Sequence, residues 1–331
     1  MNYRNLGQTG LRVSELCLGA MTFGKESDEK ASFEIMDRYL EAGGNFIDTA
    51  DVYNAGVSEE IVGRWLKDHR REIVLATKFR HRTDPGPNGL GASRYHIMHA
   101  AEDSLRRLNV DAIDLYQIHI WDSATPLEET LRALDDLVRQ GKVRYLGVSN
   151  FAGWQLATAL GISARLGLER FVCLQPQYSL ISRGIEYELI PLCLSEGIAI
   201  IPWSPLGGGF LTGKYTREQR PDGARLSSDA GGPGENIWSR RATERNWAIV
   251  DAVQAIAGAH GVSPAQVALA WVLAQPGVTS PIIGARNLEQ LEDNLAAADL
   301  ALSSDDLARL DAISAPEEIY PYRVIRDLGT R

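Results

Sequence analysis

The stretch "NFIDTADVYNAG", residues 45–56, decides the interpretation of the fold, because a short apolar run ends in Asp48, Asp51 and Tyr53 and a helical pattern follows. The same order recurs along the chain, where short apolar runs alternate with amphipathic segments. We count eight runs, at residues 14–20, 45–50, 72–79, 112–119, 143–150, 171–179, 198–204 and 279–285. Apolar strands that alternate with helices predict parallel strands covered on their outer face. Eight such units favour an α/β fold, a (β/α)8 TIM barrel.

Three segments are additions to a minimal barrel. Residues 3–13, "YRNLGQTGLRV", predict an N-terminal hairpin around Gly7 to Gly10 that closes the N-terminal end of the barrel. Residues 204–240 lack periodicity and are rich in glycine, proline and serine, as expected of a long functional or disordered loop. We interpret this loop as a strap over a bound cofactor. An extra helix is predicted at residues 241–261, and the chain ends in a tail.

The length of 331 residues suits one closed barrel or two smaller domains. A doubly wound sheet is the structural alternative, but the chain has no G-x-G-x-x-G match. No segment requires a linker, so residues 1–331 are predicted to form a single barrel domain.

Composition excludes several classes of function. The net charge of -9 argues against nucleic-acid binding, because phosphate binding requires clustered Lys and Arg. The N-terminal residues lack an apolar targeting segment and no run of 18 apolar residues follows, which predicts a cytoplasmic protein with no membrane partner.

Cys17, Cys173 and Cys193 lie in apolar contexts and are predicted to be buried thiols. His96 and His99 are spaced for one helix face, but no carboxylates converge there, so no metal site is predicted.

The ends of three consecutive predicted strands carry a set of ionisable side chains. Active sites of such barrels lie at the C-terminal ends of the strands. The second run ends with Asp48 and, after its turn, Tyr53; the third run ends with Lys78 and the fourth with His119. A tyrosine titrates near ~10, so it needs a nearby cation to act as a general acid at neutral pH. Lys78 supplies that charge, Asp48 holds the ammonium in place, and a neutral His119 orients a carbonyl oxygen. Asp51 is expected only to cap the turn.

Such a centre protonates a developing alkoxide but contains no nucleophile. The chain shows no serine elbow, no Cys-His arrangement and no glycosidase-type carboxylate pair, so hydride from a cofactor is the natural attacking species. The Tyr-x-x-x-Lys pattern of short-chain dehydrogenases and the His-x-His pattern of metal-dependent barrel hydrolases are both absent from the sequence.

These residues resemble the aldo-keto reductase superfamily over nearly the whole chain. "FIDTADVY" (46–53), "ATKF" (76–79) and "YQIHIWD" (116–122) resemble the segments that carry its catalytic Asp, Tyr, Lys and His. Its cofactor-binding segments are matched by "GVSN" (147–150), "LQPQYS" (174–179), "WSPLGGGFLTGKY" (203–215) and "IIGARNLEQLEDNL" (282–295). The "GAR" and "WSPLGGG" forms look closer to the bacterial and channel-associated branches than to mammalian aldose reductases, where a lysine-serine pair occupies the adenosine site. The resemblance implies a barrel that binds NADP(H) without a Rossmann motif and transfers hydride between the nicotinamide and an aldehyde, ketone or alcohol.

The resemblance also assigns cofactor-binding residues by position. At the nicotinamide, it places Ser149, Asn150 and Gln175 on the carboxamide and Trp203 on the ring. Along the pyrophosphate it places Leu206, Gly207 and Lys214. At the adenosine end it places Arg286, Gln290, Asp293 and Asn294, and Ser204 and Gly284 complete the set of cofactor-binding residues. Arg286 is expected to face the 2'-phosphate, since a guanidinium binds phosphate in a bidentate manner. Asp293 leaves an alternative open, because a carboxylate near the ribose reads a free 2'-hydroxyl in NAD-preferring sites.

The sequence predicts the substrate less specifically than the reaction. Phe23, Phe79, Trp121 and Phe151 are predicted to form an aromatic pocket for a small carbonyl or alcohol substrate, while Arg80 and Arg82 suggest an anionic group. A second function stays open, that of a nucleotide-binding redox sensor or regulatory subunit with little turnover. The sequence does not determine the oligomeric state.

Overall fold

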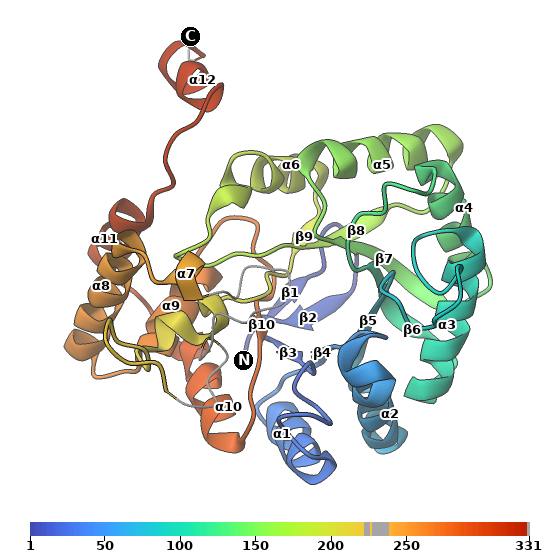
Figure 1. Ribbon diagram of the computed structural model, residues 1–331, viewed down its shortest axis with the longest axis horizontal. Coiled ribbons are helices and arrows are strands. Elements are labelled where there is room, and N and C mark those ends of the chain that lie inside the picture. The colour runs from blue at the N-terminus through green and yellow to red at the C-terminus, as the bar shows by residue number, and fades with distance from the viewer. Residues whose placement is uncertain (222–225, 227–237, 330–331) are drawn as a thin grey trace.

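The computed structural model, which describes residues 1–221, 226 and 238–329, forms a barrel of parallel strands surrounded by helices (Figure 1). The strands follow the order β10-β3-β4-β5-β6-β7-β8-β9, and every neighbouring pair is parallel. Their bounds are β3 (Cys17–Gly19), β4 (Phe46–Asp48), β5 (Val74–Phe79), β6 (Ile113–Ile118), β7 (Val143–Ser149), β8 (Phe171–Gln175), β9 (Ala199–Ile200) and β10 (Ile282–Ile283). Each lies within one of the eight predicted runs.

Backbone hydrogen bonds join the two edges of the sheet. The Ile282 amide donates to the Pro202 carbonyl at 2.8 Å, and the Thr279 amide donates to the Ile200 carbonyl at 2.7 Å. The predicted (β/α)8 barrel is therefore confirmed, and closure leaves no exposed sheet edge between β9 and β10.

A helix follows each strand and covers the outer face of the barrel. These helices are α1 (Glu29–Glu41), α2 (Val57–His69), α3 (Arg94–Leu108), α4 (Leu127–Arg139), α5 (Gly153–Leu166), α6 (Leu189–Glu196), α9 (Pro264–Leu273) and α10 (Leu288–Leu295). Their apolar faces pack with the strands in one buried cluster. Because both faces of each strand are covered, strands such as β5 and β6 are buried at every position, as near-continuous apolar runs require.

The N-terminal hairpin closes one end of the barrel, as predicted. Its strands β1 (Tyr3–Asn5) and β2 (Arg12–Ser14) are antiparallel. Leu6 and Val13 have no exposed surface and pack with Cys17, Phe46 and other residues of the barrel interior. The C-terminal ends of the strands lie at the opposite end, which leaves that end for the site.

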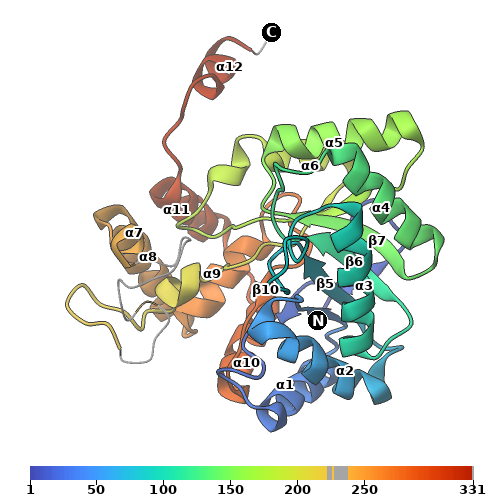
Figure 2. The same ribbon diagram turned by 45° about the vertical axis from the view of Figure 1, so that its right-hand side comes forward.

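The predicted extra helix is α8 (Glu244–His260), preceded by the short α7 (Trp238–Arg241). Much of the predicted strap, residues 222–225 and 227–237, lies outside the described residues. After α11 (Ser304–Ser314) the chain reaches α12 (Tyr322–Leu328), which projects from the barrel in both views (Figures 1 and 2). Its first residue still contacts the segment before α6, because the Tyr322 hydroxyl donates to Glu188 at 2.7 Å and its ring stacks on Tyr187 at 4.9 Å.

The three cysteines are buried and free, as predicted. Burial raises the pKa of each thiol, to about 12 for Cys193. Within the described chain, no single helix has the length and apolarity to cross a bilayer, and only the bent pair α8 and α9 meets both criteria when taken together.

Candidate active site

Asp48 and Lys78 form a buried ion pair at the C-terminal ends of β4 and β5. The Lys78 ammonium donates to Asp48 Oδ2 at 2.5 Å and to the Thr49 carbonyl at 2.8 Å. The Lys78 side chain is 0% exposed and that of Asp48 3%. Burial by itself lowers the pKa of Lys78, but the Asp48 carboxylate and the Tyr53 oxygen raise this pKa above its ordinary value. Lys78 therefore carries its positive charge at neutral pH.

Tyr53 receives the third hydrogen bond of that ammonium. Lys78 Nζ lies 3.2 Å from the Tyr53 hydroxyl oxygen and 4.7 Å from the centre of its ring. The turn after Tyr53 is strained, since Asn54 and Ala55 have φ values of 49° and 54° without being glycine. The Asn54 side-chain amide donates to the Gly24 carbonyl, which fixes the turn. The phenol is thus held beside a permanent cation.

His119 follows β6 and faces Tyr53. The two ring centroids lie 5.7 Å apart with the planes at 81°. Burial and the charge of Lys78 lower the pKa of His119 well below its ordinary value, so the imidazole is neutral at neutral pH. Its Nδ1 atom is buried and has no hydrogen-bond partner among the described residues. A neutral imidazole here can donate one N–H to a carbonyl oxygen next to the phenol.

The second oxygen of Asp48 is held by two glutamines. Gln117 Nε2 donates to Asp48 Oδ1 at 3.0 Å, and Gln175 Nε2 donates to the same atom at 2.9 Å. Sequence reasoning missed Gln117, because an amide inside the apolar strand β6 gives no chemical pattern. Gln175, predicted to hold the nicotinamide, directs its side-chain amide to the carboxylate in this structure. The glutamines therefore fix the orientation of the carboxylate that faces Lys78.

Ser149, Asn150 and Trp203 lie together where β7 and β9 end. The Asn150 side-chain amide donates to the His119 carbonyl at 2.9 Å, and its oxygen accepts from Trp203 Nε1 at 3.1 Å. The Ser149 hydroxyl donates to the Gln175 carbonyl at 2.8 Å. Residues assigned to the nicotinamide from three strand ends thus contact one another and His119.

The glycine-rich turn after Trp203 brings Ser204, Leu206, Gly207 and Lys214 together. Gly207, Gly208 and Gly209 all have φ between 60° and 90°, and the Gly208 amide donates to Ser204 Oγ at 3.0 Å. A Cβ atom at Gly209 would lie 2.7 Å from Lys214 Nζ. Gly209 has φ of 90° and no Cβ atom, so the turn brings the Lys214 ammonium against bare backbone, an arrangement suited to an anion.

The residues assigned to the adenosine end surround the start of α10. Gln290 Oε1 accepts from the Arg286 amide at 3.0 Å, and Asn294 Nδ2 donates to the Gly284 carbonyl at 3.1 Å. Asp293 Oδ1 accepts from Gln266 Nε2 at 2.8 Å. Near them, Glu26 Oε1 lies 3.9 Å from the guanidinium of the half-buried Arg286.

The predicted aromatic pocket is corrected in part. Trp121 packs edge to face against Phe151 at 5.1 Å and against Trp154 at 5.7 Å. Phe23 and Phe79, however, have no exposed surface and belong to the apolar core, Phe79 stacked on Tyr116 at 4.8 Å. Phe79 follows Lys78 on β5, so the two side chains take opposite faces of the sheet, and that of Phe79 packs on the helix-covered face.

The prediction that Asp51 caps the turn is also wrong. Its carboxylate is 2% exposed, and neither oxygen meets a hydrogen-bond partner among the residues described. Burial, together with the nearby Glu59 carboxylate, raises the pKa of Asp51 to about 8. Asp51 is therefore largely protonated at neutral pH, whereas Asp48, three residues earlier at the end of β4, is ion-paired.

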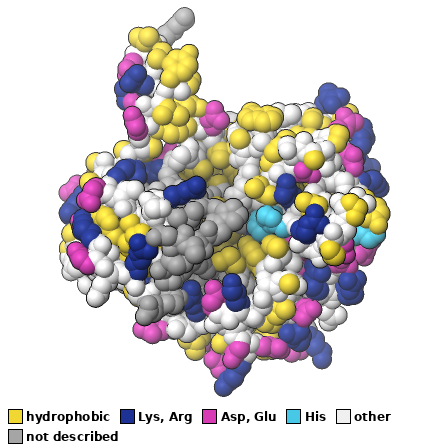
Figure 3. Space-filling model, viewed as in Figure 1, with side chains coloured by type: hydrophobic (Ala, Val, Ile, Leu, Met, Phe, Trp, Pro, Cys, Tyr) yellow, Lys and Arg dark blue, Asp and Glu magenta, His cyan; other side chains and the backbone are white. Residues whose placement is uncertain are grey.

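A histidine that the sequence did not single out lies beside the site. His81 packs edge to face against His119 with ring centroids 4.6 Å apart. Figure 3 shows histidine atoms exposed near the centre of the face drawn, next to hydrophobic side chains. Across the part of the chain that the structure describes, no group of three His, Cys, Asp or Glu side chains has the arrangement of a metal site.

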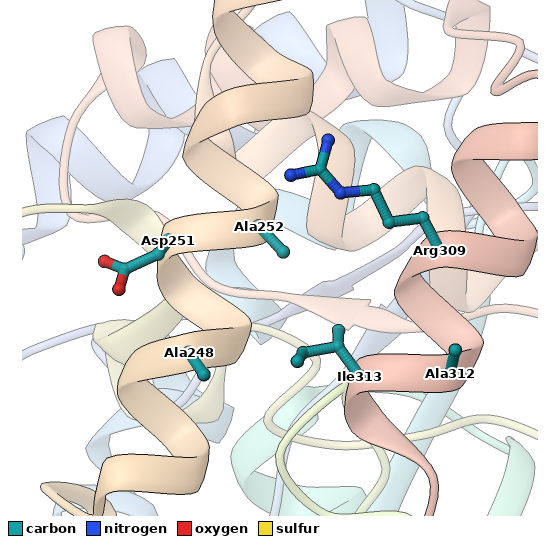
Figure 4. Close-up of a pocket in the computed structure, with 6 residues that line it drawn as sticks. All are labelled: Ala248, Asp251, Ala252, Arg309, Ala312 and Ile313. Atoms are coloured by element: carbon teal, nitrogen blue, oxygen red, sulfur yellow. The ribbon is translucent and has the colours of Figure 1, made fainter.

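A separate depression of about 560 Å³ lies between α8 and α11 (Figure 4). Ala252 and Ile313 face one another across it, while Asp251 points to the outer side of α8. None of the six residues that line it is a strand-end residue or belongs to the predicted site. Its apolar lining offers no acid or base positioned for catalysis.

Asp48, Tyr53, Lys78 and His119 thus lie together at the strand ends of a parallel barrel, the arrangement that the resemblance to aldo-keto reductases implies. A family model described as the aldo/keto reductase family matches residues 15–315. The chain belongs to this family, which confirms the resemblance seen in the sequence motifs.

Relatives place the chain within that family. It is 42% identical to an uncharacterized oxidoreductase, YrpG, of Bacillus subtilis, across 95% of this chain and 96% of that protein. It is 36% identical to a probable voltage-gated potassium channel subunit beta of Oryza sativa, across 98% of this chain and 100% of that protein. It is also 36% identical to the versiconal hemiacetal acetate reductase of Aspergillus parasiticus, across 97% of this chain and 99% of that protein. The likeness to the bacterial and channel-associated branches is thereby confirmed.

Proposed function

We propose that the protein is a cytoplasmic, NADPH-dependent carbonyl reductase, or an alcohol dehydrogenase in the reverse direction, with a small aldehyde, ketone or alcohol as substrate. The observation that carries the proposal is the fully buried Lys78 ammonium, 2.5 Å from Asp48 and 3.2 Å from the Tyr53 hydroxyl. A charged lysine costs free energy in such a place, so its position beside a phenol points to acid catalysis.

The residues fit a dinucleotide phosphate. The glycine turn at residues 207–209 presents bare backbone next to Lys214, and this fits the pyrophosphate. At the other end, the guanidinium of Arg286 suits the 2'-phosphate. Asp293 already accepts a hydrogen bond from Gln266, which favours NADPH over NADH because that carboxylate oxygen is engaged. When bound, NADPH supplies the hydride.

The chain's own residues then manage the proton. Tyr53 donates its hydroxyl proton to the carbonyl oxygen as negative charge develops there. Lys78 stabilises the resulting phenolate, because its ammonium lies 3.2 Å from that oxygen. Asp48 keeps the ammonium charged and oriented, and the two glutamines keep Asp48 oriented. The N–H of neutral His119 holds the carbonyl oxygen beside Tyr53. In the reverse direction the phenolate accepts the proton of an alcohol.

A panel of aldehydes, ketones and alcohols with NADPH or NADP+ tests this function, with the absorbance of the reduced nicotinamide as the readout. We expect turnover with at least one carbonyl compound that requires Tyr53. Tight NADPH binding with no turnover across the panel would instead support a nucleotide-binding regulatory subunit. That second function is favoured by one observation, the 36% identity to a protein named as a probable potassium channel subunit beta.

A further inference from the structure

His81 forms the outer end of a row of three rings at the barrel mouth. Tyr53 packs edge to face with His119 at 5.7 Å, and His119 packs edge to face with His81 at 4.6 Å. His81 is half-buried, so part of its ring remains accessible. It has no part in the proton transfer described above, which involves only the inner two rings.

The backbone that delivers His81 is strained. Arg80, directly before it, has φ of 116° although it is not glycine, a conformation that side chains other than glycine rarely adopt. The surrounding structure maintains it, since the Gly91 amide donates to the Arg80 carbonyl at 2.9 Å and the Arg80 guanidinium lies 3.8 Å from Asp122. Asp122 is fixed in turn by the Ala92 amide at 2.7 Å. The fold thus holds His81 in one place against His119.

The two arginines of this loop face other partners. Arg82 donates to the carbonyls of Asp84 and Gly86 within its own loop, and Arg80 pairs with Asp122. On the loop after β5, the His81 ring therefore packs against His119. Burial and the charges of Arg80 and Lys78 lower the pKa of His81, so its ring is neutral, with one nitrogen as donor and the other as acceptor. Such a ring suits an uncharged oxygen better than a carboxylate.

We propose that His81 is a substrate-binding residue that hydrogen-bonds a second oxygen on the carbon next to the reacting carbonyl, which makes 2-hydroxy and 2-oxo carbonyl compounds the favoured substrate class. The inference rests on the proposed function. His119 holds the reacting oxygen beside Tyr53, and the His81 ring contacts the His119 ring. Oxygens on adjacent carbons lie roughly one hydrogen-bond length apart, so both rings can be reached at once.

The aromatic side chains next to His119 suggest the remainder of the substrate. Trp121, two residues after His119, packs against Phe151 and Trp154, and Trp154 is 62% exposed. An aryl group attached to the carbonyl can pack on this apolar surface. Aryl 2-hydroxy ketones therefore combine both features of the site.

A matched pair of ketones tests the inference. 2-Hydroxyacetophenone and propiophenone have nearly the same shape and differ in a hydroxyl against a methyl group. The quantity to measure is the ratio of their kcat/KM values with NADPH, compared between wild type and variants, because the different intrinsic reactivity of the two ketones cancels in that comparison. His81→Phe keeps a ring but removes the hydrogen bond, and we expect it to lower the ratio roughly fivefold.

Two further variants complete the test. His81→Gln restores a donor and an acceptor and should recover part of the ratio, while the control His99→Phe changes an exposed histidine of α3 and should leave it unchanged. NADPH titration shows that each variant is folded. An unchanged ratio in His81→Phe, with turnover of both ketones intact, overturns the role of His81 alone. Failure of the wild type to reduce either ketone overturns the substrate class, and failure across the wider carbonyl panel overturns the proposed function as well.

Discussion

Asp48→Asn removes one negative charge from the centre of the site and changes almost nothing in shape. At the observed separation of 2.5 Å, the attraction between Asp48 and the Lys78 ammonium is roughly 6 to 7 kcal/mol at an effective dielectric constant of about 20. The variant leaves a fully buried ammonium without a counter-ion. Burial then lowers the pKa of Lys78, and at neutral pH the lysine loses much of its charge.

Two consequences follow for Asp48→Asn. Breaking a buried ion pair by removal of one partner costs about 3 to 5 kcal/mol of stability. Because Tyr53 no longer lies beside a cation, kcat/KM for carbonyl reduction should fall by at least ~10²-fold at pH 7, the scale of general acid catalysis. Chemical denaturation and a kcat/KM profile against pH measure the two effects separately.

Glu59→Gln is the matched control, since Glu59 is also fully buried and pairs with Arg107 at 2.7 Å. It should lose comparable stability and yet keep kcat/KM within about threefold, because its partner cation does not contact Tyr53. If Asp48→Asn keeps the wild-type pH profile and activity while remaining folded, then the charge of Lys78 does not depend on Asp48 and the reasoning is refuted.

Three further predictions concern the cofactor and stability. Arg286→Ala should weaken NADPH binding about tenfold to a hundredfold and leave NADH nearly unchanged in fluorescence titrations, whereas equal losses for both would show that Arg286 does not read the 2'-phosphate. Glu26→Gln should tighten NADPH binding about twofold to fivefold, because it removes a carboxylate 3.9 Å from Arg286, and weaker binding would contradict this. The raised pKa of Asp51, about 8, means that folding takes up a proton, so wild-type stability falls as pH rises from about 4 to about 8. Asp51→Asn has no such titration, so its free energy of unfolding should rise relative to that of wild type by up to about 1.4 kcal/mol per pH unit in that range. If the free energies of unfolding of the two proteins change with pH in parallel, the raised pKa of Asp51 is ruled out.

The sequence was sufficient to predict the barrel and to predict that the side chains proposed as catalytic would lie together, for identifiable reasons. Apolar strand runs and amphipathic helices have periods that can be read locally, and parallel strands bring their C-terminal ends to one face. Asp48, Lys78 and His119 follow directly from those two facts. Tyr53 required only that the turn after β4 return to the mouth.

Other features depend on tertiary contacts and could not be predicted. Gln117 is indistinguishable in the sequence from any polar residue in a strand until Asp48 is placed opposite it. The position of His81 is set by the positive φ of Arg80, and no local sequence pattern predicts that backbone conformation. Phe23 and Phe79 were assigned to the pocket because they flank site residues, but which face of the sheet a side chain takes is set by packing.

The most direct test of the proposed mechanism is the rate of hydride transfer in a single turnover by Tyr53→Phe, which removes only the hydroxyl group to which acid catalysis is assigned. With NADPH affinity and thermal stability unchanged, the rate of NADPH oxidation by a bound carbonyl substrate should fall by at least ~10²-fold. Retention of more than a tenth of the wild-type rate, with hydride transfer shown to be the step observed, would contradict Tyr53 as the general acid.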